Sequence, residues 1–305
     1  MTFQSAVGHG NLPNGLWSPV IYSQKTLDYL TRVAISSEIT NTDYEGEISN
    51  YGDTVNIIKQ PVITISDYAR GTKIVPQDLN DEQIQMVVDQ GKYYAFQMDD
   101  IEKRLSHIDW EQKAMASGAY ELKNNYDTNI LSYIQTNSTT AAATGTAGSP
   151  ITIGYGASNS FTPLDYIGRF ARLMDENDVP ETERYFVATP AFWEQLGRED
   201  GKFIDAAVVG GGDSALRNRK LVTSKMIHGF ICLKSNNVPV DSSSNISVLA
   251  VHKSATATAT ALVKAETQRL IESFGDQYKS LLVFGRKMLR PECSFTGSIS
   301  SLADA

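Results

Sequence analysis

The chain contains 305 residues, 41% of them hydrophobic and 20% charged, a balance typical of a folded protein rather than a disordered one. Its 27 basic and 35 acidic residues give a net charge of -8, which argues against a stand-alone nucleic-acid binder, whose affinity depends on a basic surface. No apolar run reaches the roughly 18 residues that cross a membrane. Residues 1–20 show no secretory signal, so we expect a cytosol-like compartment.

Two extended segments follow an irregular N-terminal region. Residues 1–25 are rich in glycine, proline and asparagine, which indicates an arm, and a short helix is expected over residues 23–35. Residues 53–66 and 84–97 are rich in β-branched or aromatic side chains and predict an outgoing and a returning strand, separated by a polar tip. We therefore predict a two-stranded loop that reaches out from the body of the protein.

A single long helix is expected after the returning strand. It begins near Asp99 and Asp100, acidic residues that suit a helix N-terminus, and continues to about residue 135, well beyond the globular mean of about 12 residues. One narrow stripe recurs along it in steps of four and three, at Ile101, Leu105, Ile108, Gln112, Met115, Ala119, Leu122, Tyr126, Ile130 and Tyr133. The charged remainder favours a strut that lies along a sheet. The same spacing occurs in coiled coils, so that alternative stays open.

Residues 150–260 are predicted to form a compact α/β lobe, preceded by an uncharged loop of small residues at 136–149. Thr162 and Pro163 suit the cap and the first turn of a helix that is expected to end near residue 177. The other elements expected in the lobe are strands at 184–188, 229–234 and 246–251 and a helix that begins at residues 189–190.

Extended segments return after the lobe, at residues 261–269, 278–284 and 287–292, and Gly285 is expected to form a turn between the last two. These strands need partners to pair with and a helix to cover them. The base of the extended loop and the long helix supply both, so the lobe is predicted to be an insertion into a second domain.

The familiar signatures of catalysis are missing from the sequence. It contains no Gly-x-Ser-x-Gly elbow, no phosphate-binding P-loop and no His-Glu-x-x-His helix. Its 4 histidines are widely separated, and neither Cys232 nor Cys293 has a second cysteine or a histidine at metal-ligand spacing. We therefore expect no enzyme activity, no cofactor and no metal site.

The polar tip of the extended loop mixes charged and aromatic residues that are common in docking surfaces, although a solvated hairpin end explains this composition almost as well. The candidate inter-subunit contact residues are Lys59, Asp67, Tyr68, Arg70, Lys73 and Asp78. Lys59 and Lys73 are more simply interpreted as ordinary surface lysines than as donors of a covalent crosslink.

The order of these elements, together with several local segments, resembles the major capsid proteins of tailed bacteriophages, of the Hong Kong 97 type. The segments that carry the resemblance are residues 52–55, 62–64, 183–192, 226–239, 264–266 and 284–292. Each segment is a weak signal by itself, but their order along the chain is specific. The likeness extends from about residue 23 to residue 300.

The resemblance implies an α+β, Hong Kong 97-like capsid fold with an N-terminal arm, an extended β-loop, a long spine helix, a peripheral domain and an inserted axial α/β domain. The expected boundaries are 1–35 for the arm and short helix, 36–98 for the extended β-loop and its base, 99–135 for the spine helix, 136–260 for the axial domain with its linker, 261–300 for the closing strands and 301–305 for a tail. Gly46, Gly52 and Gly71 are then candidate flex points for a rearrangement during maturation.

The implied function is that of a coat protein that assembles into the icosahedral head shell of a tailed phage and encloses double-stranded DNA without reading its sequence. The implied partners are further copies in hexamers and pentamers, a separate scaffolding protein, a portal and, optionally, a cement or decoration protein, with no membrane. The implied location is the virion capsid, assembled in the host bacterial cytoplasm. Two alternatives stay open: an encapsulin-type nanocompartment shell around a protein cargo, and an α/β enzyme of unrecognised type.

Overall fold

The computed structural model describes residues 34–44, 54–58, 61, 63–71, 73–74, 76–78, 83–105, 110–154, 161–196, 226–243, 245–271 and 273–302. Gly46, Gly52 and Lys59 lie outside these ranges. Residues 1–33, which hold the expected arm and most of the expected short helix, lie outside them as well. Helix α1 (Ser36–Ile39) begins directly after the position at which that short helix was predicted to end.

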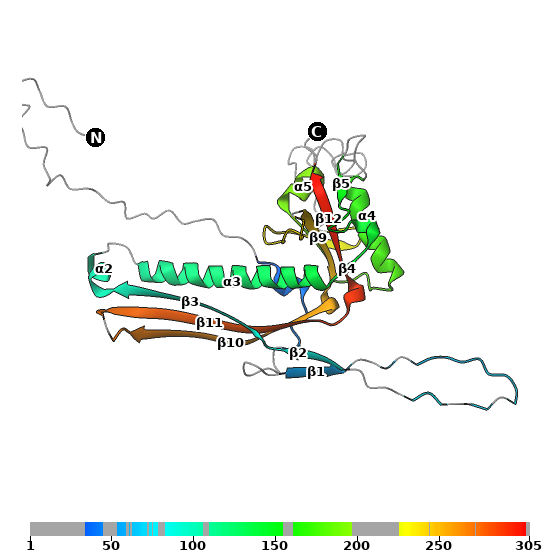
Figure 1. Cartoon of the computed structure of the whole chain (residues 1–305), viewed down its shortest axis with the longest axis horizontal. Helices are drawn as coiled ribbons and strands as arrows, with labels where there is room; N and C mark the ends of the chain where they lie inside the picture. Colours follow the sequence, from blue (N-terminus) through cyan, green and yellow to red (C-terminus); the bar gives the residue numbers. More distant parts are fainter. Residues whose placement is uncertain are drawn as a thin grey trace, which may run out of the picture.

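An elongated body carries a lobe at one end, and a narrow loop extends beyond the body (Figure 1). In the body, helix α3 (Trp110–Asn137) lies along a three-stranded antiparallel sheet. The strands of this sheet follow the order β10 (Thr256–Arg269), β11 (Gly275–Met288) and β3 (Gln90–Asp99). The fold is therefore mixed α+β, as predicted.

The packing of α3 on the sheet bears out only part of the predicted apolar stripe. Its C-terminal members are half-buried or buried, at Leu122, Tyr126, Ile130 and Tyr133, whereas Ile101, Gln112 and Ala119 are exposed. Strand β3 alternates between half-buried and exposed residues, as expected for a sheet covered on one face. Tyr94 of β3 lies against Gly118 of α3, where an added Cβ would come within 2.8 Å of the tyrosine ring. Tyr126 of α3 packs edge-on against Phe284 of β11, with 4.7 Å between ring centroids. The strut interpretation is confirmed, and among the described residues no second helix of comparable length offers a coiled-coil partner.

The prediction of one unbroken helix from residue 99 to residue 135 is wrong at its N-terminal end. Helices α2 (Asp100–Leu105) and α3 are separate, residues 106–109 lie outside the described ranges, and α2 is turned away from the axis of α3 (Figure 1). The backbone N–H of Asp100 donates to the carbonyl oxygen of Phe274 at 3.1 Å, so α2 is held by the hairpin of β10 and β11. This tertiary contact overrides the helical pattern of the sequence.

The extended loop starts from a short antiparallel ladder. Strand β1 (Thr54–Ile58) pairs with β2 (Gln83–Val87), and Val55, Met86 and Val88 are buried together against the sheet. The returning segment, predicted as one strand over residues 84–97, is divided, because β2 belongs to the loop and β3 joins the sheet of the body. The single-strand prediction is wrong here since the partner of β3, strand β11, comes much later in the chain.

The described part of the lobe is built on a seven-stranded sheet in the order β4-β12-β9-β6-β8-β7, with β5 also paired to β12. Its strands are β4 (Thr139–Thr140), β5 (Ile151–Ile153), β6 (Arg184–Ala188), β7 (Met226–Ile227), β8 (Phe230–Lys234), β9 (Ile246–His252) and β12 (Ser294–Leu302). Strands β6, β8 and β9 confirm the three predicted in this region.

Two helices of the lobe, α4 (Pro163–Glu176) and α5 (Pro190–Leu196), also lie where they were predicted. Thr162 caps α4, because its Oγ1 accepts the backbone N–H of Asp165 at 3.2 Å. Phe170 on the buried face of α4 packs edge-on against Phe186 of β6, with 5.6 Å between ring centroids. Short 3-10 turns complete the described elements, at η2 (Ala142–Thr144), η3 (Lys253–Ala255) and η4 (Pro291–Cys293).

The closing strands differ from the prediction at Gly285. Strand β11 passes through Gly285 without a turn, and an added Cβ there would lie 2.9 Å from the carbonyl oxygen of Val87. The glycine therefore permits a close approach of the loop base to β11, and the predicted turn is wrong. After η4 the chain enters β12, which lies between β4 and β9 and ties the C-terminal segment to the lobe.

Candidate inter-subunit surface

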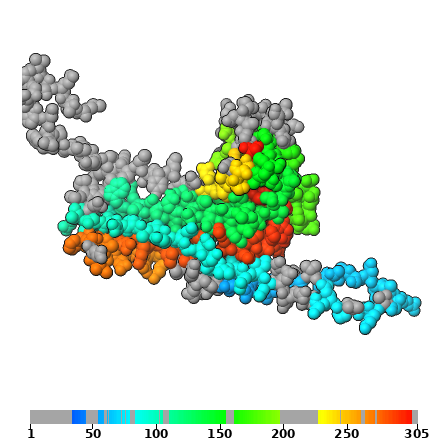
Figure 2. Space-filling model, viewed as in Figure 1, coloured from blue at the N-terminus to red at the C-terminus, as the bar shows by residue number. Residues whose placement is uncertain are grey.

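Most of the candidate contact residues lie on one projecting loop. In the space-filling view, the loop beyond β1 and β2 projects past the body as a narrow extension (Figure 2). Asp67, Tyr68, Arg70, Lys73 and Asp78 are all exposed on it. The structure thus brings together every predicted contact residue except Lys59, which lies outside the described ranges.

The same loop exposes isoleucines that the sequence analysis did not select. Ile63 is 71% exposed, Ile65 94% and Ile74 76%. Ile63 and Ile65 are two residues apart in an extended segment, so their side chains lie on the same side of the chain. Burying one such side chain is worth about 1.5–3 kcal/mol. The alternation of isoleucines at positions 63 and 65 is visible in the sequence, where it was interpreted only as the pattern of a strand and not as an exposed apolar surface.

Two features define the shape of the loop. The backbone N–H of Thr64 donates to Oε1 of Gln77 at 2.9 Å and so connects its two sides. Gly71 lies at the turn with a φ of 91°, a left-handed conformation that a side chain would strain. The predicted flex point at Gly71 is therefore a position where the turn requires glycine.

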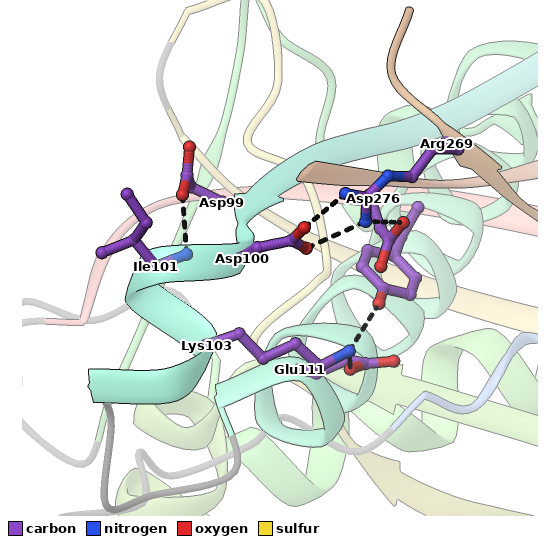
Figure 3. Close-up of polar contacts among 8 residues, drawn as sticks. Asp99, Asp100, Ile101, Lys103, Glu111, Arg269 and Asp276 are labelled. Atoms are coloured by element: carbon purple, nitrogen blue, oxygen red, sulfur yellow. Dashed lines mark hydrogen bonds and ion pairs between the residues drawn. The ribbon is translucent and has the colours of Figure 1, made fainter. Parts of the chain in front are cut away.

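The opposite end of the body carries a second exposed region, where the β10–β11 hairpin meets α2. Ile271 is 95% exposed and Phe274 is 80% exposed. Beside them, Nη1 of Arg269 lies 2.9 Å from Oδ1 of Asp100 and 3.3 Å from Oδ1 of Asp276 (Figure 3). The hydrogen bond with Arg269 holds the pKa of the Asp100 carboxyl below its usual value.

A neighbouring cluster joins α2 to the start of α3 and to the sheet. Lys103 pairs with Glu111, and its Nζ lies 3.4 Å from the hydroxyl oxygen of Tyr278 (Figure 3). The hydrogen bond with Lys103 lowers the pKa of Glu111, whereas burial raises the pKa of Tyr278. Because Lys103 is exposed and Glu111 is only partly buried, their ion pair orients α2 more than it stabilises it.

The sheet of the body is hollowed on the face that carries Tyr93, which is 77% exposed. A shallow hollow of about 300 Å³ is lined by Tyr93, Leu281, Ser280, Lys264, Glu266 and Lys279. Nζ of Lys279 lies 3.1 Å from Oε2 of Glu266, which also pairs with Lys264. Sequence reasoning missed this surface, because it forms only when β3, β10 and β11 align.

The described residues show little of the chemistry that catalysis uses. Among them, no three histidine, cysteine, aspartate or glutamate side chains gather where they could hold a metal ion. Burial raises the pKa of Cys232 to about 11 and also raises the pKa of Cys293, so both thiols stay protonated near neutral pH. None of the described helices is both long enough and apolar enough to cross a membrane.

Comparison with solved structures gives matches over almost the whole chain. A protein of Mycobacterium phage Che8 matches with a TM-score of 0.78 and 23% identity, over 92% of this chain and 97% of that one. A capsid structure of the cyanophage P-SCSP1u matches with a TM-score of 0.70 and 17% identity, over 96% and 98% of the two chains. The mature capsid of bacteriophage PhiM1 matches with a TM-score of 0.68 and 16% identity, over 99% and 98%.

No protein-family model matches the chain, and comparison with curated proteins gives no match either. The likeness is therefore one of three-dimensional structure, and it spans nearly all of both chains. The chain has the α+β fold of phage capsid proteins, the fold that the sequence resemblance implied.

Proposed function

We propose that this chain is a major capsid protein that self-assembles into the icosahedral head shell of a tailed bacteriophage and encloses its double-stranded DNA. The observation that carries the proposal is the full-length structural likeness to chains from capsid structures of the cyanophage P-SCSP1u and bacteriophage PhiM1. The role is structural, with no catalytic step and no cofactor.

The arrangement of the exposed surfaces supports assembly. The projecting loop and the hairpin end lie at opposite ends of the molecule, so they cannot meet within one subunit (Figure 1). Two different surfaces on one subunit favour head-to-tail contacts, which close into rings when the rotation between neighbours allows it. In this proposal the loop residues Asp67, Tyr68, Arg70, Lys73 and Asp78 lie on a neighbouring subunit together with the exposed isoleucines.

The finer assignments follow the same proposal. The body serves as the peripheral domain and the lobe as the axial domain, and subunits form hexamers and pentamers. A separate scaffolding protein, a portal and an optional cement protein complete the head, which assembles in the host bacterial cytoplasm and becomes the virion capsid. The net charge of -8 supports enclosure of DNA without sequence-specific binding.

A nanocompartment shell around a protein cargo is the alternative that shares this assembly mode. It is not favoured, because the similar structures named above come from phages.

Expression of the chain without other viral proteins, followed by electron microscopy, tests the proposal. We expect closed shells, or free pentameric and hexameric rings of subunits, because the subunit carries its own contact surfaces. A chain that stays monomeric at every salt and protein concentration tried, both alone and when expressed with the other head proteins of its phage, would contradict the proposal.

A further inference from the structure

A fully buried carboxylate lies at the junction of the body and the lobe. Asp127 of α3 is 0% exposed. Its Oδ1 accepts the backbone N–H groups of Ile35 at 2.8 Å and Ser36 at 2.7 Å, and its Oδ2 accepts Nδ2 of Asn237 at 2.8 Å. These three donors are neutral, and each comes from a segment far from Asp127 in the sequence.

The first of these segments connects α3 to β10, an edge strand of the sheet. Ile35 directly precedes α1, and Ser36 is its first residue. Asn41, just after α1, exchanges backbone hydrogen bonds with β10: its N–H donates to the carbonyl of Thr256 at 2.9 Å and its carbonyl accepts the N–H of Thr258 at 2.9 Å. Residues 35–41 therefore connect the carboxylate of Asp127 to the sheet of the body.

The second segment belongs to the lobe. Asn237 is 3% exposed and follows strand β8. The apolar core continues across the same junction, since Ile35 and Ile39 share one buried cluster with Ile130 and Ile134 of α3 and with the lobe. Asp127 is thus the polar point at which the N-terminal segment, the long helix and the lobe all meet.

Other contacts fix α3 to the sheet just after Asp127. Nη1 of Arg286 donates to the carbonyl oxygen of Asn129 at 2.6 Å, and the backbone N–H of Met288 donates to the hydroxyl of Tyr133 at 3.2 Å. These bonds set the helix on the body but do not reach residue 237. A second polar link joins α3 to the lobe, because Nε2 of Gln135 donates to Oγ of Ser247 in β9 at 2.5 Å. Asp127 is the link that also holds the N-terminal segment.

We propose that Asp127 is a positioning residue for assembly, which fixes the N-terminal segment and the lobe on α3 and so sets the angle between the lobe and the body. This inference rests on the proposed function, because the angle matters only if subunits close into a shell. The rotation between neighbours follows from the angle between the contact surfaces of one subunit, and closure depends on that rotation. The joint therefore determines which curvature the shell adopts.

The chemistry of the site explains why a carboxylate is required. An ionised carboxylate offers only acceptors, so it can satisfy all three donors at once. An amide at position 127 can still accept the two backbone N–H groups with its oxygen, but its NH₂ group then faces the NH₂ group of Asn237. In the parent orientation of Asn237 two buried donors face each other, and the link to the lobe returns only if the Asn237 amide turns over by 180°, which disturbs its other interactions.

Three variants test this joint: Asp127→Asn, Asn237→Asp and the double variant that combines them. The matched control is Glu121→Gln, at an exposed position of the same helix. We expect Asp127→Asn to lower the yield of shells of the parent diameter by about tenfold, because a buried donor is left unpaired. In the double variant the amide at position 127 donates to the carboxylate at position 237, so parent shells return. Electron microscopy measures diameter and yield, and circular dichroism verifies folding.

Two results would overturn the inference: folded Asp127→Asn subunits that give parent shells in parent yield, or a folded double variant that behaves no better than Asp127→Asn. If Asp127→Asn does not fold, Asn237→Ala replaces it, because this change removes only the donor from the lobe. Parent-like shells from Asn237→Ala would also overturn the inference.

A second measurement separates this inference from the proposed function. Spin labels at Glu176→Cys in the lobe and Thr267→Cys in the hairpin, in a chain with Cys232→Ser, report the distance between lobe and body in the isolated subunit. A chain that forms no shells would contradict the proposed function but not this inference. Even in that case, we expect a narrow distribution of distances between the two labels in the parent chain, a broader one in Asp127→Asn and a narrow one again in the double variant. An unchanged distribution in Asp127→Asn would refute the joint.

Discussion

Gly297 of β12 shows how closely single residues are fitted in the lobe. An added Cβ at this position would contact the hydroxyl oxygen of Tyr166 and would lie 2.6 Å from the carbonyl oxygen of Thr144. The Tyr166 hydroxyl already donates to that carbonyl at 2.7 Å, and burial raises the pKa of the tyrosine. The space that the glycine leaves is therefore used by a buried hydrogen bond.

Gly297→Ala is expected to lower the free energy of unfolding by about 2 kcal/mol, the usual cost of overpacking a buried site. Gly91→Ala is the matched control, because Gly91 also lies in a strand but an added Cβ meets no atom within 4 Å. Urea unfolding of both variants measures the difference. Equal stabilities would contradict this account of Gly297.

The charged residues around α2 predict a response to acid. Hydrogen bonds with Arg269 and Lys103 hold the pKa values of Asp100 and Glu111 below the ordinary values of 3.8 and 4.5. A carboxyl whose pKa is lowered by folding stabilises the structure above its unfolded pKa and loses this effect as the pH falls through its folded pKa. Attachment of α2 should therefore be constant from neutral pH to about 4.5 and weaken below that.

Amide exchange of residues 100–105, corrected for the intrinsic effect of pH, measures this attachment. Protection should decrease between about pH 4.5 and pH 2.5, and Asp100→Asn should remove part of that decrease because it removes one of the two carboxylates. Protection that stays the same across this range in the parent chain would argue against the role of these pairs.

At the scale of elements, the extended loop is a feature whose apolar side chains the single chain leaves uncovered. Its exposed isoleucines have no partner strand within the described residues, and the paired ladder ends at Ile58 and Gln83. A loop of this kind adds little to the stability of its own subunit. Its apolar surface is available to a neighbouring subunit.

Replacement of Ile63 and Ile65 by serine should change the free energy of unfolding by less than about 0.5 kcal/mol, as for other exposed positions. The same double variant should lose shell assembly, because each isoleucine is expected to be buried only between subunits. Thr64→Ala, which alters the exposed residue between them, is the control and should assemble normally. Light scattering follows assembly, and a double variant that assembles like the parent would exclude these residues from the contact.

Elements whose signals are local could be predicted from the sequence. The cap by Thr162 and the proline at the start of α4 act within one helical turn, and the strand at 184–188 is a short apolar run. Elements that depend on distant partners could not. The division of the returning segment into β2 and β3 depends on β11, the strand with which β3 pairs. Gly285 was predicted to form a turn, although it makes room for the carbonyl of Val87.

The candidate inter-subunit surface could also be predicted only in part, where its signals are local in the sequence. Composition located the loop and its polar tip, because the local signals of strands and turns are strong there. The hollow beside Tyr93 and the burial of Asp127 depend on residues brought together from separate parts of the chain. Asp127 carried no sign in the sequence that distinguished it from a solvated acid on a long helix.

At the scale of the whole molecule, the described chain is an elongated body with a lobe at one end and a loop that extends beyond both (Figure 1). The loop and the hairpin end expose large apolar side chains at the two extremes of the molecule. Each contact can be modest, because closure of a shell makes many weak contacts act together. This is the reason to expect that assembly, rather than a pocket, is the function of this shape.

A cryo-electron microscopy reconstruction of the assembled protein tests that central claim most directly. We predict a closed icosahedral shell in which residues 63–78 of every subunit lie on a different subunit, with Ile63, Ile65 and Tyr68 buried at the contact. A closed shell in which residues 63–78 touch only their own subunit would contradict the account.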